Sequence, residues 1–389
     1  MSTRLTGYRR PDGGWGIRNH VLVLPLHAAA NLAADRIAAG IPGAVAVGHA
    51  WEAPPGDPDH DRIARTLAGY AANPNVYAAV LIAIRGSDVA ISELAKRRGA
   101  RVHVVAMADH RGTIGTVEAA RPLVASLAKE AAGAKREPMP MSGIVLGLEC
   151  GGSDALSGIT ANPALGIASD LLIAEGCTSI LAETPELIGA EHLLARRAAT
   201  PAVARRVIEV ITGFEAAIRD LGVDVRGAQP TPGNQAGGLT TIEEKSLGAA
   251  KKGGGATVVG VMDFAEPPTA PGLWIMDTPG HDIEQMVGMV AGGANIAAFT
   301  TGRGTPTGSP ITPVVKIATN RSIFRRLNGD IDLDAGAIIE GEETLDSMGR
   351  KILEFILEVA AGRLTSSEVR GNREFAISRT VSPMTGFTG

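Results

Sequence analysis

The chain has 389 residues, of which 45% are hydrophobic and 20% are charged, and its net charge is −4 at neutral pH. This length predicts two or three domains. The slightly negative charge, without a basic stripe, disfavours nucleic acid as a partner, and no run of about 18 apolar residues is present to span a bilayer. Two cysteines, Cys150 and Cys177, make no disulfide framework, and the first residues lack an apolar signal region. We therefore expect a cytoplasmic protein with reduced thiols and no membrane or nucleic-acid partner.

The first third of the chain alternates apolar runs with helix-like segments of about a dozen residues. This alternation predicts right-handed crossovers and a parallel sheet covered on both faces, which is a doubly wound α/β domain. The domain is expected at residues 1–132, after a glycine-rich, turn-forming lead-in at residues 7–16. We predict strands at residues 20–26, 44–47, 76–84 and 102–106, and helices at 28–39, 60–70 and 87–98.

Residues 133–142 contain charges and prolines and predict a linker. The α/β pattern then restarts, so a second, larger α/β domain is expected at residues 143–389. We predict its strands at residues 144–148, 178–182, 257–262, 273–276 and 296–299. Helices are expected at residues 163–175, 190–198, 202–221, 243–251, 282–291 and 345–360.

The strand at residues 144–148 leads directly into Cys150-Gly151-Gly152-Ser153-Asp154. Open α/β sheets bind their ligands beyond the carboxyl ends of the strands, where glycines let backbone amides approach an anion. Taken alone, the motif is more typical of a tight turn with a buried structural cysteine.

Further polar loops follow other predicted strands, and each also has a purely structural interpretation. Thr241 with Glu244 three residues later makes a helix capping box, and a lone His192 is more often a structural histidine than a ligand. Together these loops predict one composite polar crevice. They carry Glu183, Glu186, His192, Asn234, Lys245, Asp277, Arg303 and Lys316.

Strong sequence signals for other chemistries are absent. The chain has no paired Cys-x-x-Cys, no His-Glu-x-x-His, no Gly-x-Ser-x-Gly and no Gly-x-Gly-x-x-Gly after the first strand. A scattered set of cysteine, histidine and carboxylates is compatible with Fe²⁺, Mn²⁺ or Mg²⁺. The nearby arginine and lysine predict an anionic, carboxylate-bearing substrate.

Seven motifs closely resemble the altronate/galactarate dehydratase family, in the family's order and from about residue 5 to residue 377. They are GYRRPDG (7–13), GIRN (16–19), CGGSD (150–154), GITANP (158–163), GAEH (189–192), GGLTTIEEK (237–245) and TGRG (301–304). The resemblance implies a Rossmann-like domain followed by a large C-terminal domain, and dependence on a divalent metal, typically iron.

Two departures from the family's pattern stand out. The small N-terminal domain of full-length dehydratases does not precede the GYRRPDG motif, which implies a separate small subunit and a hetero-oligomer, as in sulfolactate sulfo-lyase. The chain also lacks the cysteine that many dehydratases have a few residues after His49. The ends of the chain look more like the sulfo-lyase branch, whereas the CGGSD and TGRG motifs look more like the sugar-acid dehydratases.

Residue type and loop position suggest a role for each candidate side chain. As metal ligands we predict Cys150, His192 and Glu186, with His49 as a fourth. Lys245 is the candidate base, with its pKa lowered by desolvation or by the metal and with Glu244 or Glu243 as its orienting partner. The candidate substrate-binding residues are Arg18, Ser153, Asp154, Asn234 and Arg303, with the two arginines holding the carboxylate.

The predicted function is a metal-dependent lyase that removes water from a sugar acid to give a 2-keto-3-deoxy acid. Such a reaction removes a proton next to a carboxylate, and a bound cation stabilises the enediolate that develops. Two alternatives stay open: a large subunit of sulfolactate sulfo-lyase that releases sulfite, and a non-catalytic subunit that binds a sugar acid.

Overall fold

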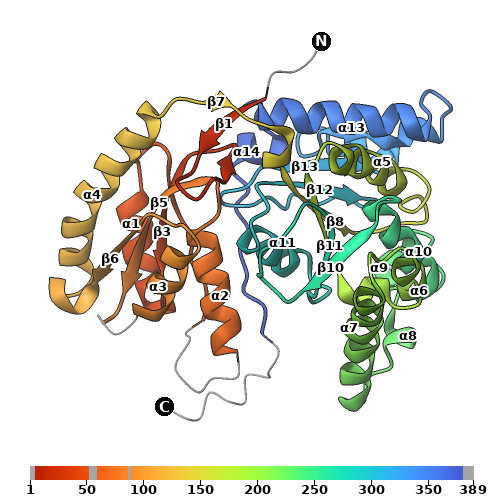
Figure 1. The fold of residues 1–389 in the computed structure, drawn as a ribbon, viewed down its shortest axis with the longest axis horizontal. Coiled ribbons are helices and arrows are strands. Elements are labelled where there is room, and N and C mark those ends of the chain that lie inside the picture. The colour runs from red at the N-terminus through yellow and green to blue at the C-terminus, as the bar shows by residue number, and fades with distance from the viewer. Residues whose placement is uncertain (1–4, 52–58, 86–88, 380–389) are drawn as a thin grey trace.

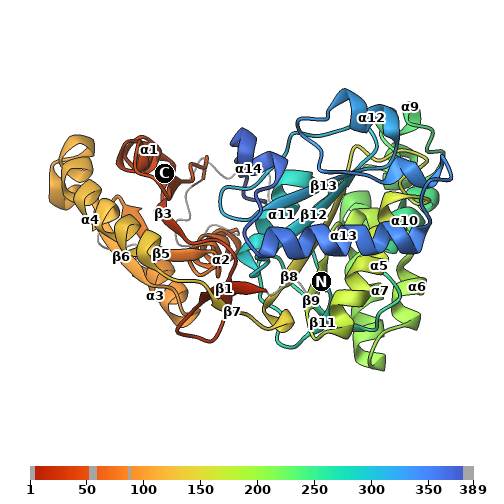
Figure 2. The ribbon, with the colours of Figure 1, turned by 90° about the horizontal axis from the view of Figure 1, so that it is seen from above.

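The computed structural model describes residues 5–51, 59–85 and 89–379, and it contains two parallel sheets, each covered by helices (Figure 1). The prediction of an α/β fold with two parallel-sheet units is confirmed. Figure 2 shows the two units side by side, with the short strands β1 and β7 between them. No described helix is long and apolar enough to cross a membrane.

The first unit has a four-stranded parallel sheet in the order β4-β3-β5-β6. Its strands are β3 (His20–Pro25), β4 (Ala44–Ala46), β5 (Val76–Ala83) and β6 (Val102–Ala106). The strands β3 and β5 are buried along almost their whole length, as is typical of a parallel sheet covered on both faces. The helices are α1 (Asn31–Ala38), α2 (His60–Ala71), α3 (Val89–Arg97) and α4 (Thr113–Gly133).

Three features of this unit differ from the sequence prediction. The lead-in forms β1 (Thr6–Arg9) and β2 (Trp15–Gly16), and the expected linker contributes β7 (Glu137–Pro138), which pairs with β1. The helix α4 was not predicted, because Pro122 lies inside it and proline usually interrupts helices. The helix predicted at 87–98 is α3, although residues 87 and 88 lie outside the described part of the chain.

The second unit has a seven-stranded sheet in the order β10-β11-β9-β8-β12-β13-β14, in which every described pairing is parallel. The central strand β8 (Val145–Gly151) carries Cys150 at its carboxyl end. The other strands are β9 (Thr178–Leu181), β10 (Val258–Met262), β11 (Gly272–Met276), β12 (Ile296–Thr301), β13 (Val314–Ala318) and β14 (Leu333–Asp334).

Helices cover both faces of the second sheet. The helix α5 (Ala161–Ala174) packs beneath α13 (Leu345–Ala360) on one face, and α11 (Asp282–Ala291) packs against β8 on the other. The remaining helical elements of this unit follow the strands, and several of them contribute to the site. They are η4 (Thr184–Leu187), α6 (Glu191–Arg196), α7 (Pro201–Asp220), α8 (Val225–Ala228), α9 (Pro232–Ala236), α10 (Ile242–Ala250), η5 (Lys251–Gly253), α12 (Arg321–Arg326), η6 (Ala335–Ile338) and α14 (Ser366–Arg370).

The two units share a continuous hydrophobic core, in which Leu67 and Tyr70 of α2 pack with Val287 and Val290 of α11. Buried asparagines bind the units together as well. Asn73 donates to the carbonyl oxygens of Val290 and Ala294 at 2.8 and 2.9 Å. Because these polar groups are satisfied across the junction, the relative placement of the units is held by both packing and hydrogen bonds.

Candidate active site

The thiol at the carboxyl end of β8 lies next to two carboxylates from the segment that follows the neighbouring strand β9. The Cys150 backbone N donates to Glu183 Oε1 at 2.6 Å, and the Cys150 thiol donates to Glu183 Oε2 at 3.2 Å. The Glu186 carboxylate lies 3.7 Å from the same sulfur. All three ligand atoms lie within 4.8 Å of one another, and they form the one such set of three that the described residues contain.

The site places Glu183 in a strained backbone conformation. This residue follows β9 and has a φ of 74°, in the left-handed region that favours glycine. Such a conformation costs a non-glycine residue roughly 1–2 kcal/mol, and it persists where surrounding contacts over-determine it. Here those contacts include the Cys150 amide and the Thr278 hydroxyl, which accepts from the Glu183 amide at 2.8 Å.

Two buried lysines balance part of the negative charge. Lys252, in η5, pairs with Glu183, and both side chains are fully buried. Lys245, in α10, lies 2.8 Å from Glu186 Oε1 and also donates to Gln229 and Asn234 at 3.1 and 3.2 Å. The lysines therefore hold both carboxylates of the cluster at fixed positions.

The pKa of Lys245 is shifted in the direction opposite to the sequence prediction. Burial lowers this pKa, but Glu186, together with Cys150 and Glu183, more than offsets the effect, so that the pKa is raised overall. Burial also raises the pKa of Glu186, and burial raises the pKa of the Cys150 thiol well above its usual value. In this arrangement Lys245 holds its proton and Cys150 is a thiol.

The predicted partners of Lys245 point elsewhere. Glu243 pairs with Arg226 at 2.6 Å, and the Glu244 carboxylate accepts from the Thr240 amide at 2.8 Å. Thr241 caps α10 by accepting from the Glu244 amide, but the Glu244 carboxylate bonds Thr240 and does not complete the predicted capping box. Glu186 takes the place next to Lys245.

The two predicted histidine ligands lie outside the cluster. His192 is exposed, in the short helix α6. His49 lies in the first unit, where its Nε2 is 2.8 Å from the Pro25 carbonyl oxygen and its Nδ1 accepts from the Trp51 amide at 3.2 Å. Both ring nitrogens of His49 are thus engaged in its own unit, and neither histidine joins the described set of ligand atoms.

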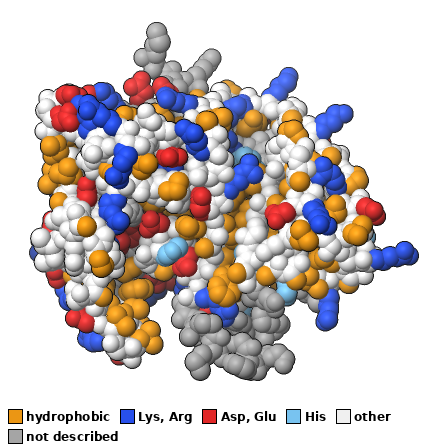
Figure 3. Space-filling view, turned by 180° about the vertical axis from the view of Figure 1, so that it is seen from behind, with side chains coloured by type: hydrophobic (Ala, Val, Ile, Leu, Met, Phe, Trp, Pro, Cys, Tyr) orange, Lys and Arg blue, Asp and Glu red, His pale blue; other side chains and the backbone are white. Residues whose placement is uncertain are grey.

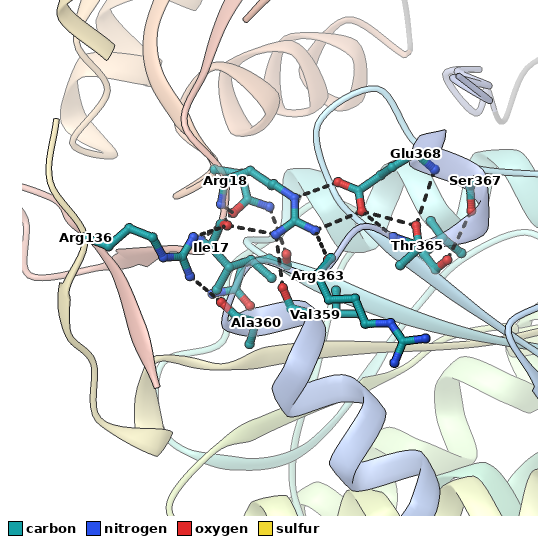
Figure 4. A network of polar contacts seen from close by, with 12 residues as sticks. Ile17, Arg18, Arg136, Val359, Ala360, Arg363, Thr365, Ser367 and Glu368 are labelled. Atoms are coloured by element: carbon teal, nitrogen blue, oxygen red, sulfur yellow. Dashed lines mark hydrogen bonds and ion pairs between the residues drawn. The ribbon is translucent and has the colours of Figure 1, made fainter. Parts of the chain in front are cut away.

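The predicted carboxylate-binding residue Arg18 is a structural residue at the junction of the two units (Figure 4). Its guanidinium forms a two-pronged ion pair with Glu368 at 2.6 and 2.8 Å and donates to the carbonyl oxygens of Val359 and Arg363. Arg136 donates to Ala360 in the same network. These contacts leave Arg18 without free donors for a substrate at the cluster.

The remaining predicted residues surround the cluster. Ser153 Oγ lies 3.7 Å from the Cys150 sulfur, and Asn234 donates to the Ser153 carbonyl oxygen at 2.9 Å. The Asp154 carboxylate accepts hydrogen bonds from Ser157, Thr319 and Asn320. These bonds hold the loop after β8 in place. Arg303 is exposed, and its amide donates to the Gly152 carbonyl oxygen at 3.0 Å.

A pocket of about 270 Å³ opens next to Lys245. Its walls come from the loop after β8, the start of α5 and one side of α10. The lining residues include Ser153, Asp154, Ser157, Ile159, Asn162, Leu239, Glu244, Lys245, Leu247 and Lys251. The pocket thus joins the CGGSD, GITANP and GGLTTIEEK motifs in one cavity that has apolar side chains and two lysines in its wall.

Two residues of the cluster were given no role by the sequence analysis, although Glu183 is among the residues of its predicted crevice. Glu183 occupies the same place relative to β9 as Cys150 does to β8, and this strand-end position is the signal that could have identified it. Lys252 has no comparable signal, because it follows Lys251 in a helix and the sequence does not distinguish the two.

Comparisons with known proteins match both units of the chain. The family model described as D-galactarate dehydratase/altronate hydrolase, second domain, matches residues 7–132. The model described as D-galactarate/altronate dehydratase, C-terminal, matches residues 141–382.

Individual relatives agree with these models. The chain is 39% identical to the (2R)-sulfolactate sulfo-lyase subunit beta of Chromohalobacter salexigens over 96% of each chain. It is 32% identical to the altronate dehydratase of Bacillus subtilis, over 96% of this chain and 77% of that one. It is 42% identical to the galactarate dehydratase (L-threo-forming) of Escherichia coli, over 59% of this chain and 44% of that one. These matches confirm the family and the lyase class predicted from the sequence, and the chain belongs to the D-galactarate/altronate dehydratase family.

Proposed function

We propose that this chain removes water from a sugar acid of the altronate or galactarate type and gives a 2-keto-3-deoxy acid. The observation that carries the proposal is the Lys245–Glu186 pair, at 2.8 Å, in which Lys245 lines the pocket and Glu186 belongs to the cluster with Cys150 and Glu183. Dehydration breaks the Cα–H bond and the bond to the β-hydroxyl, and the resulting enol tautomerises to the keto acid. Removal of the Cα proton needs a base and stabilisation of the developing charge, and departure of the hydroxyl needs a proton donor. The carboxylates of the site are the available proton acceptors, and Lys245 is the available donor.

The pocket lining suits a polyhydroxylated anion. Ser153, Ser157 and Asn162 offer hydroxyl and amide groups, while Lys245 and Lys251 offer positive charge. Lysine binds a carboxylate through its charge, and hydroxyl and amide groups bond to the hydroxyls of a sugar acid. Arg303 is exposed and lies against Gly152 in the loop after β8. It is our candidate for binding the end of the substrate that lies away from Lys245.

We propose a divalent metal, most simply Fe²⁺, as the cofactor. The residues present fit such an ion, because a thiol and two carboxylates converge, and mixed sulfur and oxygen ligands suit borderline divalent metals. Cys150, Glu183 and Glu186 would hold it, in place of the set with His192 and His49. A bound divalent metal would supply Lewis-acid stabilisation of the negative charge that develops on the substrate.

Lys245 is the proposed proton donor to the departing hydroxyl. A lysine whose pKa is raised by a neighbouring carboxylate remains an ammonium at neutral pH, and an ammonium is an acid. The hydrogen bonds to Gln229 and Asn234 orient its Nζ. This role replaces the base predicted from the sequence.

The test is anaerobic turnover with Fe²⁺ on a panel of aldonic and aldaric acids, with 2-keto acid as the readout. Lys245→Met should abolish keto-acid formation, whereas Lys351→Met, on an exposed face of α13, is the control and should not. In D₂O the Lys245→Met variant should still exchange the α-proton of the substrate, as observed by NMR. Loss of this exchange together with elimination would instead identify Lys245 as the base.

Release of sulfite from sulfolactate is the second candidate function. It is favoured by the relative named (2R)-sulfolactate sulfo-lyase subunit beta, which aligns with 96% of this chain at 39% identity. The chemistry is the same β-elimination with a different leaving group. Including sulfolactate in the panel and measuring sulfite separates the two functions, since only the sulfo-lyase releases it.

We also propose a hetero-oligomer with a separate small subunit. The word "subunit" in the name of that relative supports a partner chain. Co-expression with a candidate small chain followed by size-exclusion chromatography tests this proposal, and a chain that turns over substrate fully on its own would contradict it.

A further inference from the structure

A second buried polar group lies behind the cluster, on the opposite face of β8. Glu149 precedes Cys150 and is fully buried. Within the described part of the chain, neither of its carboxylate oxygens has a hydrogen-bond partner. A buried carboxylate without partners is costly, so such a group requires an explanation in a folded protein.

The register of β8 shows what Glu149 faces. Side chains at positions 147, 149 and 151 point to the same face of the sheet. A Cβ atom on Gly147 would lie 3.2 Å from the sulfur of Met289, and one on Gly151 would lie 2.1 Å from Asp282 Oδ2. Glu149 therefore faces the middle of α11, between Asp282 and Met289.

Gln285 occupies that middle position. It lies three residues after Asp282 and four before Met289, so that all three share one face of the helix. Gln285 is almost fully buried, and both its amide oxygen and its amide nitrogen lack a hydrogen-bond partner among the described residues. Two unsatisfied polar side chains, one from the sheet and one from the helix, thus face the same interior space.

This space is lined by acidic groups. Burial, with a smaller contribution from Glu183, raises the pKa of Asp282 to about 6. Burial and then Glu183, which also contacts the Glu149 carboxyl group, raise the pKa of Glu149. Of the lysines that act on these groups, Lys252 is paired with Glu183 and Lys245 is paired with Glu186. Two carboxylates and an amide oxygen without their own cation are the ligands that hard divalent cations prefer.

We propose that Glu149, Asp282 and Gln285 hold a second cation, a hard divalent ion bound through oxygen only, behind the thiol-containing cluster. This site is independent of the proposed function, because none of its three residues takes part in the proposed elimination. Cys150 and Glu149 are consecutive in β8 and point to opposite faces of the sheet, and Glu183 interacts with both, so the two cations would be neighbours with different ligands.

Mn²⁺ binding to the full chain tests the proposal without any measurement of activity. The experiment uses the Cys150→Ser chain, in which the thiol is absent, and follows free Mn²⁺ by electron paramagnetic resonance. This chain should bind one Mn²⁺. Adding Glu149→Gln should weaken binding at least tenfold, whereas adding Glu186→Gln, on the other face of β8, should leave it unchanged.

Gln285→Leu provides a second variant in case Glu149→Gln does not fold. It keeps the side-chain volume, removes the amide oxygen and leaves the thiol cluster untouched, and it should also weaken Mn²⁺ binding at least tenfold. The proposal is overturned if Cys150→Ser binds no Mn²⁺, if Glu149→Gln and Gln285→Leu both bind it as well as their parent, or if Glu186→Gln weakens binding equally. A failure to find turnover with any sugar acid would leave this result unaffected.

Discussion

Replacing Lys252 with methionine should destabilise the protein strongly. Lys252 and Glu183 form an ion pair in which both side chains are fully buried, and Glu149 and Glu186 add further negative charge nearby. Removing one partner of a buried ion pair leaves the other charge uncompensated, which typically costs about 3–5 kcal/mol. We therefore expect the free energy of unfolding to fall by roughly 4 kcal/mol. That is a large part of the stability of an ordinary domain.

The measurement is urea unfolding of the metal-free chain, followed by circular dichroism. Arg350→Met is the matched control, because its ion pair with Asp346 is about two-thirds exposed at both ends and should contribute no more than about 0.5 kcal/mol. Adding Glu183→Gln to Lys252→Met should recover most of the lost free energy of unfolding, since it removes the uncompensated charge of Glu183. A loss below about 1 kcal/mol in Lys252→Met, or no recovery in the double variant, would refute the reasoning.

Three further predictions concern the neighbourhood of the site. Gly151→Ala should lower metal content and activity together, because its Cβ would lie 2.1 Å from Asp282 Oδ2 and 2.8 Å from Phe299; normal metal content in a folded Gly151→Ala chain would contradict the packing. Arg18→Met should lower the free energy of unfolding by about 2 kcal/mol, which is typical of hydrogen bonds to charged groups, and should leave KM unchanged. A raised KM would show instead that Arg18 binds the substrate. The pKa of Asp282 is about 6 in the folded chain and 3.8 in the unfolded chain, so the folded metal-free chain binds a proton more tightly. Its free energy of unfolding should therefore fall by up to roughly 3 kcal/mol as the pH rises from 4 to 7. Asp282→Asn should remove this part of the pH dependence of urea unfolding. An unchanged pH profile in this variant would exclude Asp282 as its source.

Much of the fold could be predicted because local signals agree with it. The helix predicted at residues 345–360 is α13 with the same ends, since Thr344 caps it and one apolar face is buried. The strand β8 ends in glycines, as expected of a strand that opens a ligand crevice. The pairing of β1 with β7 could not be predicted, because it joins segments about 130 residues apart and each strand is only a few residues long.

The surface offers less guidance than the strand ends. On the face shown in Figure 3, acidic and basic side chains are interspersed and no continuous basic area is visible. Such a surface identifies no partner by charge, whereas the polar side chains of the site converge because the strand ends that carry them are adjacent.

The partner of Lys245 could not be predicted from its neighbours along the chain. Glu243 and Glu244 were chosen as partners of Lys245 because they precede it, but residues one and two apart on a helix do not face each other. Lys245 points into the crevice, so its partner had to come from another strand end. The strand β9 lies directly beside β8, and the loop after β9 carries Glu183 and Glu186. In a parallel sheet, the partner of a residue that faces the crevice is therefore better sought in the loop after an adjacent strand than among its neighbours along the helix.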